Sequence, residues 1–393
     1  MKYLFKLILL FFLSSSLYGQ GSLVWDFATK GGVYSSPVVD DSTVYIGSND
    51  SFLYALDKFH GGLKWKFRTE GQIKSRLLLL NGYVIFNSTD GLVYSINTRN
   101  AEIQWQFRTG GEKELDLWDY YLSSPALSGD KLFVGSGDGN VYALDSNSGR
   151  LAWKFETGGI VHATPIIHNK KVYVGSFDGY FYALNSDNGE LVWKFRTVGD
   201  TYFPKGEIQK GATIHHNAVI FGSRDYNIYA LDVESGRGLW NMKEKGSWII
   251  ATPLVVEKTV FFGTSDSHRF CGVSIENGVE EYTFPLNMRV YGDAICYESA
   301  IYFGCFNGKL YRVDTNTHTI ESIFQTHGSK KNYHEVYTEN DVFKPDFILY
   351  GTDTKGSEKI IMNLGAILST PVIDGGIAYL GDSNGIIYAY KLN

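Results

Sequence analysis

The sequence predicts an all-β fold, an eight-bladed β-propeller of four-stranded antiparallel blades closed by its N-terminal strand. Three observations predict it: tryptophan recurs at a fixed interval, short strand-like runs fill each interval, and the last copy of the repeat is incomplete. The recurring tryptophans are Trp25, Trp65, Trp105, Trp153, Trp193 and Trp240. Three of the steps between them are 40 residues, and the steps of 48 and 47 contain insertions. A period near forty indicates repeats that bury their apolar faces against one another.

Each repeat contains four short runs rich in Val, Tyr, Phe and Leu, bounded by Gly, Asp, Asn or Ser. In the third copy these runs are 124–127, 131–136, 140–145 and 151–155. Such runs are typical of short strands joined by tight turns. The second and third runs are often joined by Asp-Gly, as at 138–139, which favours a hairpin. Each repeat is therefore predicted to form a four-stranded meander.

The ring is expected to close through the two ends of the chain. Seven complete copies begin near Ser35, Ser75, Ser123, Ala163, Ala212, Ala251 and Asp293. The eighth begins at Ser369 and stops at Asn393 after three strands, and the run 23–27 supplies its missing outer strand. This pairing would remove two open sheet edges. The sixth and seventh copies lack the tryptophan, with Tyr282 and the weaker remnant 323–324 in its place.

The segment 326–368 interrupts the repeat between the seventh and eighth blades. It contains strand-like runs at 347–351 and 359–362. A degenerate blade, a replacement outer strand and a protruding loop are the alternatives. Because eight blades already account for both ends, we expect an insertion that packs an extra hairpin on the ring. A segment of this length is commonly functional or disordered.

The first residues have the pattern of a secretory signal peptide. Lys2 and Lys6 precede the apolar run 7–13, and small residues lead to an expected cleavage after Gly19. The apolar run is too short to span a bilayer. The prediction is therefore a signal peptide at 1–19 and a single exported propeller domain at 20–393, periplasmic or extracellular, with no transmembrane segment after cleavage. No cysteine follows the apolar run to carry a lipid.

Charge and cysteine content exclude several classes of function. Loss of the two leader lysines changes the formal net charge from −6 to −8, and no basic stripe is present, so a nucleic-acid partner is not expected. Cys271, Cys296 and Cys305 match no metal-binding spacing. We expect them to be small buried residues, with one disulfide and one free thiol as the alternative.

One acidic position recurs in the second turn of the blades. It is occupied by Asp50, Asp90, Asp138, Asp178, Asp225 and Asp266, with Asn307 and Asn384 in the other two blades. A ring of carboxylates is able to hold a cation. The favoured interpretation is that Asp and Asn suit the backbone angles of these turns. No metal site is therefore predicted.

The end of each blade resembles the Ala-x-Asp-x-x-Thr-Gly-x-x-x-Trp repeat of pyrroloquinoline-quinone-type propellers. The run 143–153 carries it, and 55–65, 183–193 and 230–240 are similar. The resemblance implies that the six recurring tryptophans are structural and dock each blade on the next. It also implies two classes of function: quinone-dependent dehydrogenases, and non-enzymatic scaffolds such as the BamB-like propellers of outer-membrane protein assembly.

The residues favour the second class. The quinoprotein alcohol dehydrogenases carry adjacent cysteines against the quinone, and this chain has none, nor a Cys-x-x-Cys-His haem motif. We therefore expect an exported scaffold without cofactor, a monomeric ring that binds a protein or peptide partner in the cell envelope. The alternative is a dehydrogenase of alcohols or sugars that uses pyrroloquinoline quinone with Ca²⁺.

Residues that depart from the repeat point to a partner site. They lie in the connections between blades, which gather at the channel mouth of a propeller, and aromatic side chains among charges are typical of interaction surfaces. The candidates are Trp118, Tyr120, Tyr121, His162, Tyr202, Phe203, Trp248, Arg289 and Tyr291, beside Lys74 and Arg76. The alternative is that these connections fold inward and plug the channel.

Overall fold

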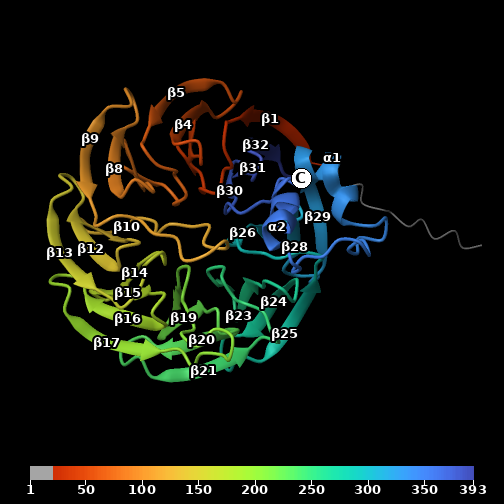
Figure 1. The fold of residues 1–393 in the computed structure, drawn as a ribbon. Coiled ribbons are helices and arrows are strands. Elements are labelled where there is room, and N and C mark those ends of the chain that lie inside the picture. Colours follow the sequence, from red (N-terminus) through yellow and green to blue (C-terminus); the bar gives the residue numbers. More distant parts are fainter. Residues whose placement is uncertain (1–20) are drawn as a thin grey trace, which may run out of the picture.

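The computed structural model describes residues 21–393, and it is a closed ring of eight four-stranded antiparallel sheets (Figure 1). The predicted eight-bladed propeller is confirmed. In blades 1 to 7 the strands lie side by side in chain order from the centre outward, and the innermost strands of most neighbouring blades contact each other. The expected signal peptide, 1–19, lies outside the described residues.

The strands of each blade are short, as the spacing of turn residues predicts. Blades 1 to 4 consist of β2 (Val38–Val39), β3 (Thr43–Gly47), β4 (Phe52–Asp57), β5 (Leu63–Arg68); β6 (Leu78–Leu80), β7 (Tyr83–Asn87), β8 (Leu92–Asn97), β9 (Ile103–Arg108); β10 (Ala126–Ser128), β11 (Lys131–Gly135), β12 (Asn140–Asp145), β13 (Leu151–Glu156); and β14 (Ile166–His168), β15 (Lys171–Gly175), β16 (Tyr180–Asn185), β17 (Leu191–Arg196). Blades 5 to 8 consist of β18 (Thr213–His215), β19 (Ala218–Gly222), β20 (Asn227–Asp232), β21 (Gly238–Lys243); β22 (Leu254–Val256), β23 (Thr259–Gly263), β24 (Arg269–Ser274), β25 (Glu280–Pro285); β26 (Ile295–Tyr297), β27 (Ala300–Gly304), β28 (Lys309–Asp314), β29 (Ile320–Gln325); and β30 (Val372–Asp374), β31 (Ile377–Gly381), β32 (Ile386–Lys391), β1 (Ser22–Ala28).

The predicted closure by the N-terminal strand is also confirmed. Strand β1 pairs antiparallel with β32, from Ser22 opposite Lys391 to Ala28 opposite Ile386. The last blade therefore has the order β1-β32-β31-β30. Because the first and last strands share one sheet, the backbone groups along β32 gain partners that an open ring would leave unpaired.

The recurring tryptophans join each outer strand to the following blade. The indole N–H of Trp153 donates to the carbonyl oxygen of Ser186 at 3.0 Å, and its ring lies against Gly189. Gly189 has a φ of +76°, and a Cβ there would lie 2.6 Å from the indole, so glycine is required on both counts. The other five indoles donate in the same way to Lys58, Thr98, Ser146, Val233 and Ile275.

The two blades without a tryptophan differ at this contact. In blade 6, Tyr282 stacks on His318 of blade 7, with ring centroids 4.1 Å apart and planes within 8°. The aromatic contact is therefore kept, although the indole is lost. In blade 7 the outer strand β29 carries Ile323 and Phe324 and no tryptophan.

The segment 326–368 folds as two helices, so the extra hairpin that we expected there is wrong. Helix α1 (His327–Val336) begins after Thr326, whose hydroxyl accepts from the backbone N–H of Ser329. Helix α2 (Thr354–Met362) begins after Asp353, whose carboxylate accepts from Gly356 N. The run 359–362 resembled a strand because it is apolar and partly β-branched. The N-cap contacts stabilise a helix and outweigh this preference for a strand. Within residues 21–393, no helix has both the length and the apolar character to cross a membrane.

The three cysteines are all free thiols. Cys271 and Cys305 are buried, as expected, whereas the expectation is wrong for Cys296, which is exposed. Cys296 is the middle residue of the short innermost strand β26, and its flanking residues are half-buried. A three-residue strand at the centre of the ring lacks the covering layers that bury the second and third strands of each blade.

Candidate functional site at the channel mouth

Three aromatic residues that depart from the repeat, Trp118, Phe203 and Trp248, meet at one end of the channel and form the centre of an aromatic cluster. The ring centroid of Trp248 lies 5.7 Å from that of Trp118 and 4.9 Å from that of Phe203. Tyr350, from the 326–368 segment, lies 6.4 Å from Trp118, and Tyr226 lies 5.8 Å from Phe203. We call these five residues the mouth cluster. The contacts are edge-to-face, the geometry that aromatic quadrupoles favour.

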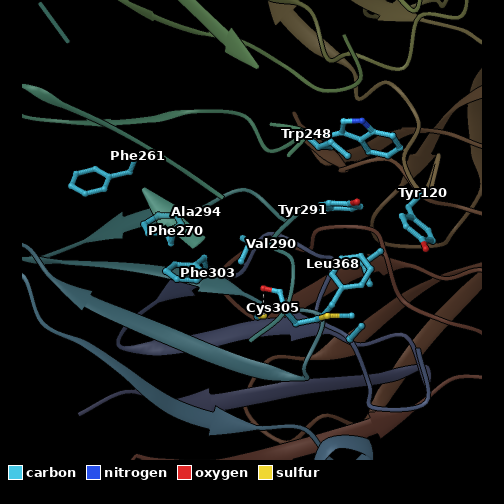
Figure 2. Close-up of a cluster of buried hydrophobic side chains, with 14 of the residues drawn as sticks. Tyr120, Trp248, Phe261, Phe270, Val290, Tyr291, Ala294, Phe303, Cys305 and Leu368 are labelled. Carbon is cyan, nitrogen blue, oxygen red and sulfur yellow. Dashed lines mark hydrogen bonds between the residues drawn. The ribbon is translucent and has the colours of Figure 1, made fainter. Parts of the chain in front are cut away.

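Below the mouth cluster, the connections fill the end of the channel with buried side chains (Figure 2). Tyr120 lies 6.3 Å from Tyr291 and 5.8 Å from Phe306 between ring centroids. The hydroxyl of Tyr121 donates to the carbonyl oxygen of Leu368 at 3.1 Å. These contacts join the connections around blades 2, 6 and 7 to the chain entering blade 8, so the connections pack on one another across the mouth.

The structure brings the nine candidate residues into one region but exposes few of them. Buried are Tyr120, Tyr121, His162, Trp248, Arg289 and Tyr291, and half-buried are Trp118 and Phe203. Tyr202 is 79% exposed. Tyr202 is therefore accessible to solvent and Trp118 and Phe203 are partly so, whereas the other six candidates are buried.

Further apolar side chains are exposed to solvent on the insertion 112–121, just before Tyr202 in the chain, and on the segment 326–368. They are Leu115, Leu117, Val198, Ile348 and Tyr350. Together with Tyr202 we call them the mouth surface. The sequence alone does not indicate these residues, because isolated apolar residues in long connections carry no periodic signal.

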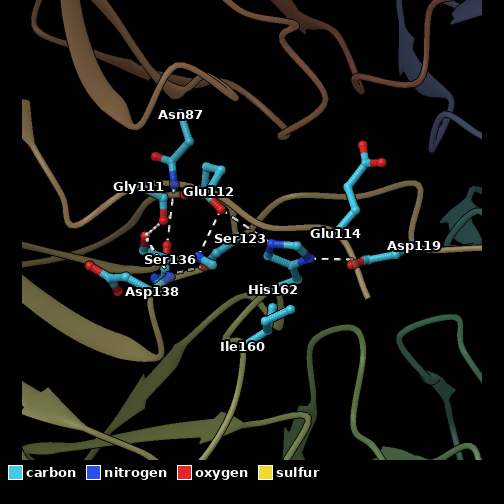
Figure 3. Close-up of polar contacts among 12 residues, drawn as sticks. Asn87, Gly111, Glu112, Glu114, Asp119, Ser123, Ser136, Asp138, Ile160 and His162 are labelled. Carbon is cyan, nitrogen blue, oxygen red and sulfur yellow. Dashed lines mark hydrogen bonds and ion pairs between the residues drawn. The ribbon is translucent and has the colours of Figure 1, made fainter. Parts of the chain in front are cut away.

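The insertion 112–121 is held to the ring by ion pairs. The buried imidazole of His162 lies between two carboxylates, with Nδ1 2.9 Å from Asp119 Oδ1 and Nε2 3.2 Å from Glu112 Oε2 (Figure 3). Burial lowers the pKa of His162, but the hydrogen bonds and charges of Asp119 and Glu112 outweigh it and raise the pKa to about 9. His162 is therefore a cation at neutral pH, and both ring nitrogens donate.

Two further carboxylates of the insertion pair with cations from other blades. Asp116 accepts from the buried guanidinium of Arg224, which also lies over the Trp248 ring at 4.5 Å. Glu114 pairs with Lys74. Each acidic residue of this insertion thus has a basic partner, and the insertion packs against blades 2, 4 and 5 at once.

Glu358 of helix α2 links the same insertion to the connection before blade 7. Arg289 is fully buried, and its Nη2 lies 2.8 Å from Glu358 Oε2. The other oxygen of Glu358 accepts from the hydroxyl of Tyr120. Glu358 was not expected at the site, because the sequence of the 326–368 segment favoured a hairpin. A helix brings this carboxylate over the mouth.

The recurring turn aspartates are used within the blades. In blade 4, Asp178 Oδ2 accepts from the Tyr182 hydroxyl at 2.6 Å and from the backbone N–H of Gly158 at 2.7 Å. The same pair of contacts recurs for Asp50, Asp90, Asp138 and Asp225. In blade 6, Asp266 accepts instead from Tyr350 of the mouth cluster. These contacts satisfy the carboxylates without a cation.

One group of three potential metal ligands occurs in residues 21–393. The ligand atoms of Glu244, Cys271 and Glu280 lie within 4.8 Å of one another. Arg269 already pairs with both carboxylates, and burial raises the pKa of the Cys271 thiol to about 12. A protonated thiol beside a guanidinium is a poor metal ligand. This group is therefore explained by the ion pairs.

Comparisons with solved structures place the fold among known propellers. BamB from Moraxella catarrhalis matches with a TM-score of 0.70 at 15% identity, covering 95% of this chain and all of that chain. A computationally designed protein, Ika8, matches with a TM-score of 0.71 at 15% identity and the same coverage. Since one of these proteins was designed, the shared fold does not specify a function.

Comparison of the sequence with protein families gives a more specific result. A search of the curated proteins finds no significant match. The profile of the family described as outer membrane protein assembly factor BamB matches three successive overlapping segments, residues 16–118, 115–243 and 203–319. These segments cover more than half of the chain and include blades 1 to 6. The chain therefore belongs to the BamB family of β-propellers.

Proposed function

We propose that this chain is an exported, non-enzymatic scaffold that binds a protein partner of the cell envelope during outer-membrane protein assembly. The observation that carries the proposal is that residues 112–121, 198–203 and 326–368 together expose apolar side chains at the channel mouth. Apolar and aromatic side chains supported by buried contacts are typical of the central part of a protein interface. The family membership supports the envelope role and the exported location.

The proposal assigns the partner contacts to the mouth surface. Tyr202 and Val198 are the most exposed apolar residues there, at 79% and 71%. The neighbouring Trp118 and Phe203 are anchored on the Trp248 ring. Anchoring of this kind lowers the entropy that side chains lose on binding. The surface is thus preorganised around a rigid aromatic centre.

The mouth does not fit a calcium-bound quinone, the alternative cofactor. Ca²⁺ requires about six to eight oxygen ligands, several of them carboxylate. The carboxylates of the mouth are paired with cations, for example Glu112 and Asp119 with His162, and Glu358 with Arg289. A Ca²⁺ ion would have to break these buried pairs, which is costly. This donor set supports a scaffold without a redox cofactor.

Site-specific photo-crosslinking in the native envelope tests the proposal. A photoreactive residue at position 202 should give a discrete crosslinked product with an envelope protein. The control position is Phe59, which is 57% exposed and lies in the turn between β4 and β5, at the opposite end of the blade from the mouth. The double variant Val198→Ser/Tyr202→Ser should lose most of the partner in pull-downs, and Phe59→Ser should not.

Two results would contradict this assignment. One is the same crosslinked product from positions 202 and 59, and the other is full recovery of the partner by the double variant. Addition of pyrroloquinoline quinone and Ca²⁺ to the purified protein tests the alternative. We expect neither protein-bound quinone absorbance nor dye-linked oxidation of alcohols or sugars.

A further inference from the structure

A cavity of about 200 Å³ lies in the channel beside Tyr34 and Tyr121, and it is lined in part by one equivalent position from every blade. This position is two residues before the innermost strand of each blade. Its occupants are Ser36, Arg76, Ser124, Thr164, Gly211, Thr252, Asp293 and Thr370. We call this set the channel ring. Five of its eight members carry hydroxyl groups.

The hydroxyls of the channel ring are held by the backbone of the neighbouring blade. Ser124 Oγ accepts from Arg76 N at 3.0 Å, Thr164 Oγ1 accepts from Ser124 N at 3.3 Å, and Ser36 Oγ accepts from Thr370 N at 2.9 Å. None of these three hydroxyls donates to another group within residues 21–393. Each of these hydroxyls therefore keeps its proton to donate to a group in the channel.

The cavity is lined by cations although the chain as a whole is acidic, with a formal net charge of −6. Lys74, Arg76, His162 and Lys210 line it, against a single carboxylate, Asp293. His162 is held between Glu112 and Asp119. Lys210 is paired with Asp293 at 2.6 Å, and Lys74 is paired with Glu114 of the insertion. The guanidinium of Arg76 has no acidic partner among the described residues, so it is the uncompensated cation of the cavity.

We propose that the channel ring binds a carboxylate group, with Arg76 as its principal partner. A guanidinium presents two parallel N–H groups that match the two oxygens of a carboxylate. The hydroxyls of the neighbouring Ser36 and Ser124 supply further donors. The cavity volume is below the ~300–1,000 Å³ of sites for drug-sized ligands. The carboxylate therefore belongs to a small free acid or to the end of a polypeptide.

Isothermal titration calorimetry on the purified chain at low ionic strength tests the site with two probes. One is succinate, with succinamide as its neutral control, and the other is a short peptide with a free or an amidated C-terminus. We expect at least one carboxylate probe to bind and its neutral counterpart not to bind. Binding of succinate identifies a small acid as the source, and binding of only the free-ended peptide identifies a polypeptide.

The variant Arg76→Gln removes the guanidinium without removing a structural contact, because its side chain has no partner in the described residues. It should keep the melting temperature and weaken carboxylate binding by about tenfold or more, the range expected for a charge-assisted pair. Arg99→Gln, at an exposed position outside the cavity, is the matched control and should bind as wild type. The proposal is overturned if neither carboxylate binds, or if Arg76→Gln binds unchanged.

Discussion

Replacing Trp153 with alanine tests whether the recurring indoles hold neighbouring blades together. The side chain is 8% exposed, donates to Ser186 O at 3.0 Å, and lies 5.7 Å from the Phe133 ring between centroids. Removing a buried tryptophan costs about 3–5 kcal/mol. The same change leaves the Ser186 carbonyl without its donor, which contributes about 1 kcal/mol. Together these give an expected loss of about 4–6 kcal/mol in the free energy of unfolding.

The assay is urea unfolding followed by far-ultraviolet circular dichroism and tryptophan fluorescence, and coincident transitions justify a two-state treatment. Leu151→Ala is the matched control, because Leu151 lies on the same strand, β13, and is 47% exposed. It should change the free energy of unfolding by less than about 1 kcal/mol. A loss for Trp153→Ala below about 1 kcal/mol, or one no larger than the control, would refute the docking role.

Two further predictions concern titratable groups. The pKa of His162 in the folded protein is about 9, above the ordinary value near 6.5. The charge of His162 therefore stabilises the fold fully below about pH 6.5, and this stabilisation is lost as the pH rises through 9. The melting temperature of the wild type should therefore fall more steeply between pH 7 and 10 than that of His162→Gln, and parallel curves would contradict the buried cation. Burial raises the pKa values of Cys271 and Cys305 to about 12, and Cys296 is the exposed thiol. Ellman's reagent at pH 8 should therefore modify one thiol per native chain and three after denaturation, and loss of the fast reaction in Cys296→Ser should identify the site.

The architecture followed from local signals that repeat. The interval between tryptophans and the Asp-Gly turns each specify a feature that depends on a few neighbouring residues. Repetition made these signals reliable, because each copy of the unit supports the interpretation of the others. The closure through β1 and β32 followed from counting strands in the first and last copies.

The candidate site was only partly predictable. The sequence identified Trp118, Trp248 and Tyr202 as departures from the repeat, and the structure places all three at the channel mouth. Their exposure differs greatly, because the burial of a residue in a connection depends on how other connections pack over it. Helix α2 was not foreseen, and with it Glu358 and its contacts with Arg289 and Tyr120.

The sequence by itself determined the number of blades, the meander of each blade and the way in which the ring closes. The first two depend on hydrogen bonds between strands that follow one another in the chain and on a periodic apolar pattern. The closure joins the two ends of the chain, and it followed because the last copy lacks the strand that the first residues supply. Only the tertiary structure decided which mouth residues face solvent, which carboxylates are neutralised, and that Arg76 remains unpaired in a cation-lined cavity. Those properties arise where segments far apart in the chain meet, and the free energy of a charge or a ring there is set by its neighbours in space.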